Sequence, residues 1–407
     1  MKKIFFMLCL SLSALSLVSC VGGGSGGQVS SLSKTPFGVS LEDSPGSKTA
    51  SHYAGVKLDV IVPVFDPNIP EDPDEYEKLG VWPELRRTES VRFAQAMKLA
   101  LQDTMAFGDV RIAPDVAVAG DLYVIGRVDK SNGEDIEIYI QVYDASGKRW
   151  SKKTFKHRVK EYHWRDVRQK DKDPYQPVFS KAAEHIVSLL KKVPQQRLGD
   201  VRAITEIKFA SAFVPGVYSD HVTVENNKIQ LVSLPPENDP MLERTRAIRV
   251  VDGLFMDKMQ THYNSLVRDT NDSYVSWQEH SLTSAKQARE AKSKAAGQAI
   301  LGGLLLLGAA YAASESDSTG DQLVTAGLAT GGVLMLQDSF SANAEGKFHQ
   351  ENLMELGQTL NFEVAPQIVE FENTTLELRG GVKSQYRQWL TVLGDLYERE
   401  RIPDIQL

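Results

Sequence analysis

Cysteine is almost absent from this chain, which has only Cys9 and Cys20 in 407 residues. Both lie in or next to an apolar N-terminal segment, so the body of the chain can form no disulfide and must be held by packing. The eight histidines are scattered, and the closest pair, His157 and His163, has neither an HExxH pattern nor a cysteine cluster beside it. The sequence therefore predicts no metal site.

An excess of positive charge is missing as well. The chain has 46 Lys and Arg against 53 Asp and Glu, and loss of Lys2 and Lys3 with an N-terminal signal would leave 44 against 53. Nucleic-acid binders neutralise phosphates with basic surfaces, so this composition predicts no nucleic-acid partner. Acidic residues such as Glu161 and Asp166 interrupt the basic run at residues 158–172. Mixed signs favour a solvated loop there over a surface that holds phosphates or peptidoglycan.

Catalytic motifs in a credible context are also lacking. The GxSxG pattern at residues 23–27 has no strand before it, and the SxxK patterns at residues 31–34 and 188–191 have no SDN or KTG partner. Asp252 and Asp257 are five residues apart on a predicted helix, so they do not share a face and are expected to be solvated. The patterns predict no catalytic residue and no cofactor. An enzyme whose site combines residues distant in the sequence stays open as the alternative.

The N-terminus contains the three parts of a secretory signal. Lys2 and Lys3 precede an apolar run at residues 4–17, and Leu-Val-Ser-Cys closes it at residues 17–20. The run is shorter than the ~20 residues that span a bilayer, and a glycine-rich stretch follows at once, which argues against a signal anchor or a buried helix. The closing residues resemble the lipobox of bacterial lipoproteins.

This resemblance implies that residues 1–19 are a signal peptide and that Cys20 becomes the first residue and carries acyl chains. Those chains would be the protein's contact with a membrane. In such lipoproteins an Asp after the cysteine retains the protein in the inner membrane, whereas Val21 stands here. The outer membrane is therefore implied, with the body facing the periplasm. Residues 20–54 are rich in Gly, Ser and Pro and predict a flexible tether.

Residues 55–195 alternate strand and helix patterns and predict a small α/β domain with a mixed or antiparallel sheet. Pro63 indicates that the first strand ends near a sheet edge or a bulge. Thr88 is the predicted N-cap of the first long helix, with Glu89 in its first turn and Gly108 at its end. The predicted strands are residues 56–64, 110–113, 122–128, 136–142 and the basic, edge-type run 150–159, and a second helix covers residues 179–192.

Part of this domain resembles the amino-terminal domain of TolB and the periplasmic domain of curli secretion-channel lipoproteins. The resemblance rests on GDLYVIGRV at residues 120–128, the strand at residues 136–142, the turn at residues 144–147 and the pair Trp150-Ser151. It implies an α/β domain of the cell envelope. The membrane-spanning hairpins of the curli channel have no counterpart here, so a pore is not implied.

Residues 196–290 predict short strands followed by a long helix. Residues 210–217 and 221–232 have strand-type patterns. From Met241 onward, apolar residues recur at steps of three or four, which is typical of an amphipathic helix. His262 belongs to this apolar stripe, and we interpret it as an edge residue of the packed face rather than as a ligand.

Residues 291–345 contain two apolar arms rich in small residues, at 297–313 and 323–336. Glycine costs up to about 1 kcal/mol inside a helix, so a repeated glycine face indicates close contact between helices. The pattern resembles a glycine-zipper hairpin, and it leaves three placements open: a core hairpin, a zipper between subunits, or insertion in a bilayer. The candidate helix-contact glycines are Gly297, Gly302, Gly303, Gly308, Gly327 and Gly331.

Residues 346–407 predict strands within 363–378 and a final amphipathic helix with Tyr386, Trp389 and Leu393 on one face. The chain is therefore predicted to be α+β. The function that these patterns favour is that of a lipid-anchored structural or assembly component of a bacterial envelope complex, with protein partners or further copies of itself. The alternative is an envelope enzyme that acts on glycan or peptide.

Overall fold

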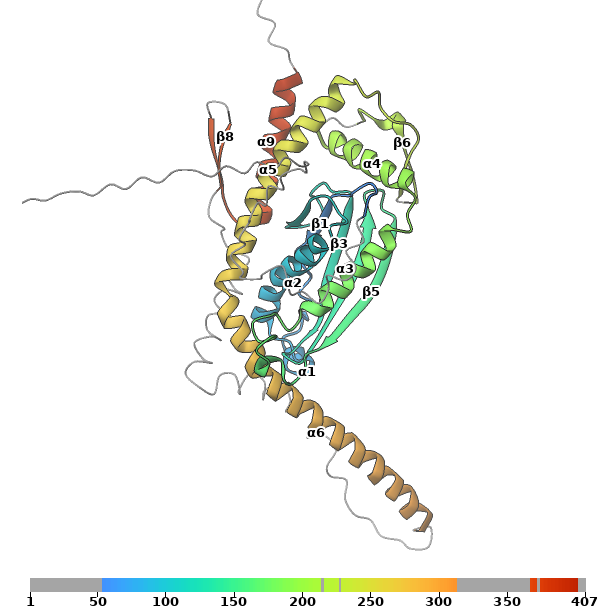
Figure 1. The fold of residues 1–407 in the computed structure, drawn as a ribbon, viewed down its shortest axis with the longest axis vertical. Coiled ribbons are helices and arrows are strands. Elements are labelled where there is room, and N and C mark those ends of the chain that lie inside the picture. Colours follow the sequence, from blue (N-terminus) through green and yellow to red (C-terminus); the bar gives the residue numbers. More distant parts are fainter. Residues whose placement is uncertain (1–52, 214–215, 227, 313–366, 372–373, 402–407) are drawn as a thin grey trace, which may run out of the picture. The chain divides into compact units, whose positions relative to one another are not determined.

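The computed structural model describes residues 53–213, 216–226, 228–312, 367–371 and 374–401. The fold is α+β, as predicted: a mixed sheet is followed by long helices, a short hairpin and a C-terminal helix (Figure 1). The described helices are α1 (Asp74–Leu79), α2 (Pro83–Asp103), α3 (Gln176–Leu190), α4 (Gln195–Phe213), α5 (Pro240–Asp269), α6 (Asn271–Ala312) and α9 (Val382–Arg401).

The main sheet has the strand order β2-β1-β3-β4-β5. β1 runs parallel to β2 and β3, whereas β3–β4 and β4–β5 are antiparallel pairs. Its strands are β1 (Val60–Pro63), β2 (Val110–Ala113), β3 (Leu122–Ser131), β4 (Asp135–Asp144) and β5 (Arg149–Arg158). β1 ends at Pro63, one residue before the end of the predicted strand. Of the two explanations predicted for Pro63, the sheet edge is wrong because β2 pairs with all four residues of β1.

Buried and partly exposed side chains alternate along the strands, so one face of the sheet is buried. In β4, Ile138 and Ile140 are buried, while Tyr139 between them is partly exposed. α2 and α3 cover the buried face of the sheet (Figure 1). The rings of Phe93 and Phe179 meet there with centroids 5.4 Å apart. This confirms the period-two reading of these strands and the two helices that cover them.

α2 begins at Pro83, well before the predicted N-cap at Thr88. Thr88 and Glu89 therefore lie inside the helix, and both side chains are buried. Proline is favourable in the first turn because its missing N–H would have had no partner there. The Thr-Glu pair looked like a cap because the same residue types are favoured at helix starts, so this prediction was wrong by more than a turn.

α4 occupies residues that the sequence predicted in part as a strand beginning at Ala210. Leu198, Val201 and Ile204 recur at helical spacing and are all buried. The strand prediction was wrong because a short apolar run cannot distinguish a strand from the end of a helix. The hairpin that follows, β6 (Val222–Glu225) with β7 (Lys228–Leu231), lies within the second predicted strand region.

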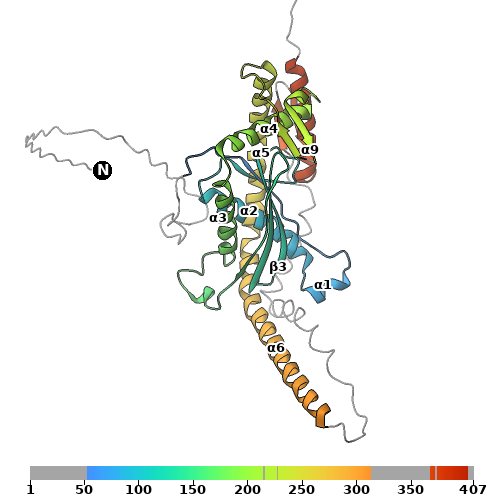
Figure 2. The same cartoon turned by 90° about the vertical axis from the view of Figure 1, so that its right-hand side faces the viewer.

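A second apolar cluster joins α5 to α9 (Figure 2). Ile248 and Phe255 of α5 belong to it together with Trp389 and Leu393 of α9, and the rings of Phe255 and Trp389 stack with centroids 4.5 Å apart. Both amphipathic stripes are thus confirmed. His262 is half-buried, in agreement with its predicted place at the edge of the stripe.

The apolar core of the sheet extends beyond the predicted domain at residues 55–195. Trp277 and Leu282, near the start of α6, belong to the same buried cluster as the sheet. Arg289 of α6 lies 2.9 Å from Glu134 in the β3–β4 turn. Helix α6 therefore completes the core of the sheet.

Several sequence predictions fall outside the described residues. These are Cys20 with its signal and tether, and the second glycine arm with Gly327 and Gly331. The first arm continues α6 as a helix through residue 312. The strands predicted within residues 363–378 are present as an antiparallel pair, β8 (Gln367–Phe371) with β9 (Thr374–Leu378). Within the described part of the chain, none of the helices is both long enough and apolar enough to cross a membrane.

Candidate functional site

The histidines and serines considered from the sequence do not converge on a site. His163 Nε2 lies 3.0 Å from the Lys172 carbonyl oxygen, and burial together with nearby positive charges lowers the pKa of His157. Ser188 Oγ donates to the His185 carbonyl oxygen at 2.6 Å, an ordinary contact within a helix. Among the residues that the structure describes, no three His, Cys, Asp or Glu side chains are grouped so that they could hold a metal ion.

Asp252 is buried, which contradicts the prediction that it would be solvated. It is 4% exposed, and its Oδ1 accepts a hydrogen bond from Trp389 Nε1 at 3.1 Å. Burial raises the pKa of Asp252 to about 6, against the opposing effects of Trp389, Arg111 and Arg249. Asp257 instead forms an ion pair with Arg111 at 2.7 Å, so the two acids have separate partners. The prediction failed because the partner of Asp252 lies on α9, far along the chain.

Asp252→Asn should make the protein more stable at neutral pH. The carboxyl group ionises near pH 4 in an unfolded chain but near 6 in the folded protein, so the free energy of unfolding falls as pH rises through this window. Asn has no charge, and its Oδ1 can still accept from Trp389. We therefore expect a gain of up to about 3 kcal/mol at pH 8. Urea unfolding at pH 4.5 and pH 8 measures it, and an equal effect at both values contradicts the argument.

A second buried carboxylate, Glu89, joins α2 to α6. Glu89 Oε1 accepts hydrogen bonds from Ser131 Oγ and, at 3.0 Å, from the hydroxyl of Tyr274. Burial raises the pKa of Glu89, and the charge of Arg86 opposes that rise. Glu89 is 0% exposed, so a ligand cannot reach it. Its hydrogen bonds instead connect α2 with β3 and α6.

β5 is an edge strand with charge of one sign. Residues 148–160 contain seven Lys or Arg and no Asp or Glu, and no described strand pairs with the outer side of β5. Two of the cations pair with acids of β4: Arg158 with Asp135 at 2.6 Å, and Lys156 with Glu137 at 2.8 Å. The other five have no carboxylate within ion-pair distance among the described residues. The predicted basic edge strand is confirmed.

The turn from β4 to β5 is braced by Asp144. Its Oδ1 accepts from the backbone N–H of Ser146 at 3.0 Å, and its Oδ2 accepts from Trp150 Nε1 at 2.9 Å. From α4, Lys208 Nζ donates to the Ala145 carbonyl oxygen at 3.1 Å. A side-chain carboxylate that binds the backbone two residues on holds a turn in one conformation. The turn is therefore a firm connection between the sheet and α4.

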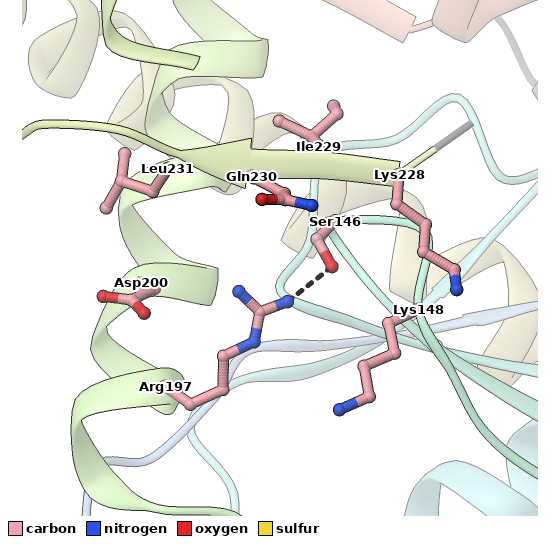
Figure 3. A pocket seen from close by; sticks show the side chains of 8 residues that line it. All are labelled: Ser146, Lys148, Arg197, Asp200, Lys228, Ile229, Gln230 and Leu231. Carbon is pink, nitrogen blue, oxygen red and sulfur yellow. Dashed lines mark hydrogen bonds between the residues drawn. The ribbon is translucent and has the colours of Figure 1, made fainter. Parts of the chain in front are cut away.

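A pocket of about 330 Å³ lies between this turn, the first turn of α4 and β7 (Figure 3). The backbone N–H of Ile229 in β7 donates to the Ser146 carbonyl oxygen at 2.9 Å. Arg197 of α4 donates to Ser146 Oγ at 2.7 Å and lies 3.6 Å from Asp144 Oδ2. Three separate elements are thus tied together around the opening, which we call the basic pocket. Its lining residues are Ser146, Lys148, Arg197, Asp200, Lys228, Ile229, Gln230 and Leu231.

Positive charge dominates the lining of the basic pocket. Lys148, Arg197 and Lys228 contribute three cations, against the single acid Asp200 (Figure 3). In the described part of the chain neither lysine has a carboxylate within ion-pair distance. The two lysines therefore give the pocket hydrogen-bond donors and positive charge that a bound ligand can contact.

Compared with protein-family models, with curated proteins and with solved structures, the chain gave no match. Its chemistry must therefore be inferred from its own geometry. Sequence reasoning found the turn and the basic strand but missed the pocket. Arg197 and Lys228 follow Lys148 by 49 and 80 residues, so no local spacing connects them. The one sequence signal was the placement of Lys148 directly after the turn.

Proposed function

We propose that the chain is a lipid-anchored assembly component of the bacterial cell envelope, and that it binds an acidic segment of a partner protein along β5. The lipobox-like residues 17–20 support the anchor, and Val21 supports the outer membrane. The resemblance of residues 120–128 to envelope α/β domains supports a periplasmic body. The observation that carries the binding proposal is the basic free edge of β5.

An edge strand offers unpaired backbone N–H and C=O groups to which another strand can add. β5 is ten residues long, which is enough for an extended ladder. Cations along an edge repel a second copy of the same strand, because like charges that face one another are unfavourable. The same cations attract an acidic strand and speed its docking. The charge pattern therefore favours a different, acidic partner over self-pairing through β5.

Lys152→Glu combined with Lys153→Glu should release the partner without unfolding the protein. Both side chains are exposed and have no carboxylate partner among the described residues, so we expect stability to change by no more than about 0.5 kcal/mol. The native mass of the full-length chain, extracted in mild detergent, should exceed that of one chain in its micelle. In the double variant it should fall to the single-chain value.

Lys191→Glu with Lys192→Glu is the matched control, since both residues are exposed at the end of α3 and carry the same charge. This control should keep the native mass of the unmodified chain. A β5 variant that also keeps that mass would show that β5 is not the docking edge. A single-chain mass for the unmodified protein would overturn the assembly role itself.

A further inference from the structure

We propose that the basic pocket is a binding site for a phosphate monoester, at the start of the basic run of residues 148–160, with which it shares Lys148. The proposal assigns a small anionic ligand to a place where three distant segments of the chain meet. It goes beyond the assembly role and does not depend on it. Three properties of the pocket support this assignment: the fixed guanidinium of Arg197, two lysines that have no carboxylate within ion-pair distance among the described residues, and the size of the opening.

Arg197 is held in place and yet reachable. One of its five N–H donors is used by Ser146 Oγ, and Asp144 lies behind it at 3.6 Å. Its side chain remains 28% exposed, so other N–H groups can meet a ligand. A planar guanidinium binds two oxygens of a phosphate at once, which adds both energy and direction. This side chain is therefore suited to anchor a phosphate.

Lys148 and Lys228 place two further cations around the same opening (Figure 3). The brace of Asp144 on the turn and the Ile229–Ser146 hydrogen bond keep their backbones in place without a ligand. Like charges held near one another repel, and an anion between them relieves that repulsion. A site whose elements are already ordered also loses less entropy when it binds. These features favour binding of a compact anion with more than one charge.

The chemistry of the lining selects the class of anion. The lining holds three cations and the single acid Asp200, and Asp144 behind Arg197 offsets a further positive charge. A phosphate monoester offers three oxygens to the three cations, whereas a carboxylate offers only two. A volume of about 330 Å³ is near the small end of ligand sites, which run from about 300 to 1,000 Å³. It accommodates a phosphate with one small group attached. Asp200 and Gln230 can exchange hydrogen bonds with hydroxyls on that group, as a polyol would supply.

The test uses the full-length chain in a non-ionic detergent and isothermal titration with two probes. Glycerol 3-phosphate represents a soluble polyol phosphate, short-chain phosphatidic acid represents a lipid headgroup, and glycerol is the uncharged control. Lys148→Gln with Lys228→Gln should weaken binding about tenfold or more, because two charge-assisted contacts are lost. Lys191→Gln with Lys192→Gln, outside the pocket, should change affinity less than twofold. Lys148→Arg with Lys228→Arg should retain binding.

Each outcome decides the proposal. Selective loss in the pocket variant for both probes supports a phosphate monoester from either source. Selective loss for one probe assigns the soluble compound or the lipid headgroup accordingly. If neither phosphate binds, or if the pocket and α3 variants lose affinity equally, the proposal is overturned. Native mass measured in the same samples reports on assembly separately, so the two proposals can fail independently.

Discussion

Cys20→Ser should abolish incorporation of labelled fatty acid into this protein. A lipoprotein anchor is built on the cysteine that ends the lipobox, and serine has no thiol for the first lipid to attach to. Each buried CH₂ contributes about 0.8 kcal/mol, so one acyl chain binds weakly and two or more bind firmly. The variant should therefore leave the membrane fraction as soluble protein or stay as an unprocessed precursor. Metabolic labelling and the mass of the mature N-terminus measure this.

Cys9→Ser is the matched control because Cys9 is the only other cysteine and lies inside the apolar run. It should be labelled as strongly as the unmodified chain. Fatty acid still attached to the Cys20→Ser protein would overturn the anchor, and with it the proposed location at the outer membrane. Labelling lost in both variants would instead show that export, not acylation, had been blocked.

Gly126→Ala should destabilise the fold strongly although it adds only one methyl group. A Cβ at Gly126, in the middle of β3, would overlap the ring of Phe65. Phe65 is 1% exposed, and the backbone N–H of Asp66 donates to the Gly126 carbonyl oxygen at 2.9 Å, so neither side can move away freely. Overpacking of this kind costs about 1–3 kcal/mol, and we expect the upper part of that range. Chemical denaturation measures the loss.

Gly199→Ala is the same chemical change at a position with the opposite expectation. Nothing lies within 4 Å of a Cβ at Gly199 in α4, and alanine favours a helix over glycine by roughly 0.5–1 kcal/mol. This variant should be neutral or more stable. Combining Gly126→Ala with Phe65→Leu should restore part of the lost stability. If the two alanine variants behave alike, β3 and Phe65 are not in close contact.

Local sequence patterns predicted correctly those helices and strands whose form depends mainly on residues close by in the sequence. β2 is correct to the residue at 110–113, and the alternation in β4 matches its burial residue by residue. The predicted apolar faces of α5 and α9 were correct for the same reason, because the 3.6-residue helical period shows which side chains share a face. The basic edge strand β5 was recognisable because its run of Lys and Arg contains no acidic residue.

Predictions failed where a distant segment determines the environment of a side chain. Asp252 was predicted to be solvated, but Trp389 of α9 packs against it and donates a hydrogen bond to its carboxylate. Glu89 was predicted in the first turn of a helix, but it lies inside α2, where Tyr274, 185 residues later, donates a hydrogen bond to it. The end of α4 read as a strand because a few apolar residues satisfy either period. In each case the missing information was the identity of the packing partner.

The sequence by itself determined the composition, the α+β class and most helices and strands, and it predicts the N-terminal signal with Cys20. These follow from local propensity and periodicity, which need only neighbouring residues. Only the tertiary structure decided which acids are buried, that α6 completes the core of the sheet, and that Lys148, Arg197 and Lys228 share one pocket. Burial and convergence depend on contacts between segments far apart along the chain, and no period in the sequence encodes such contacts.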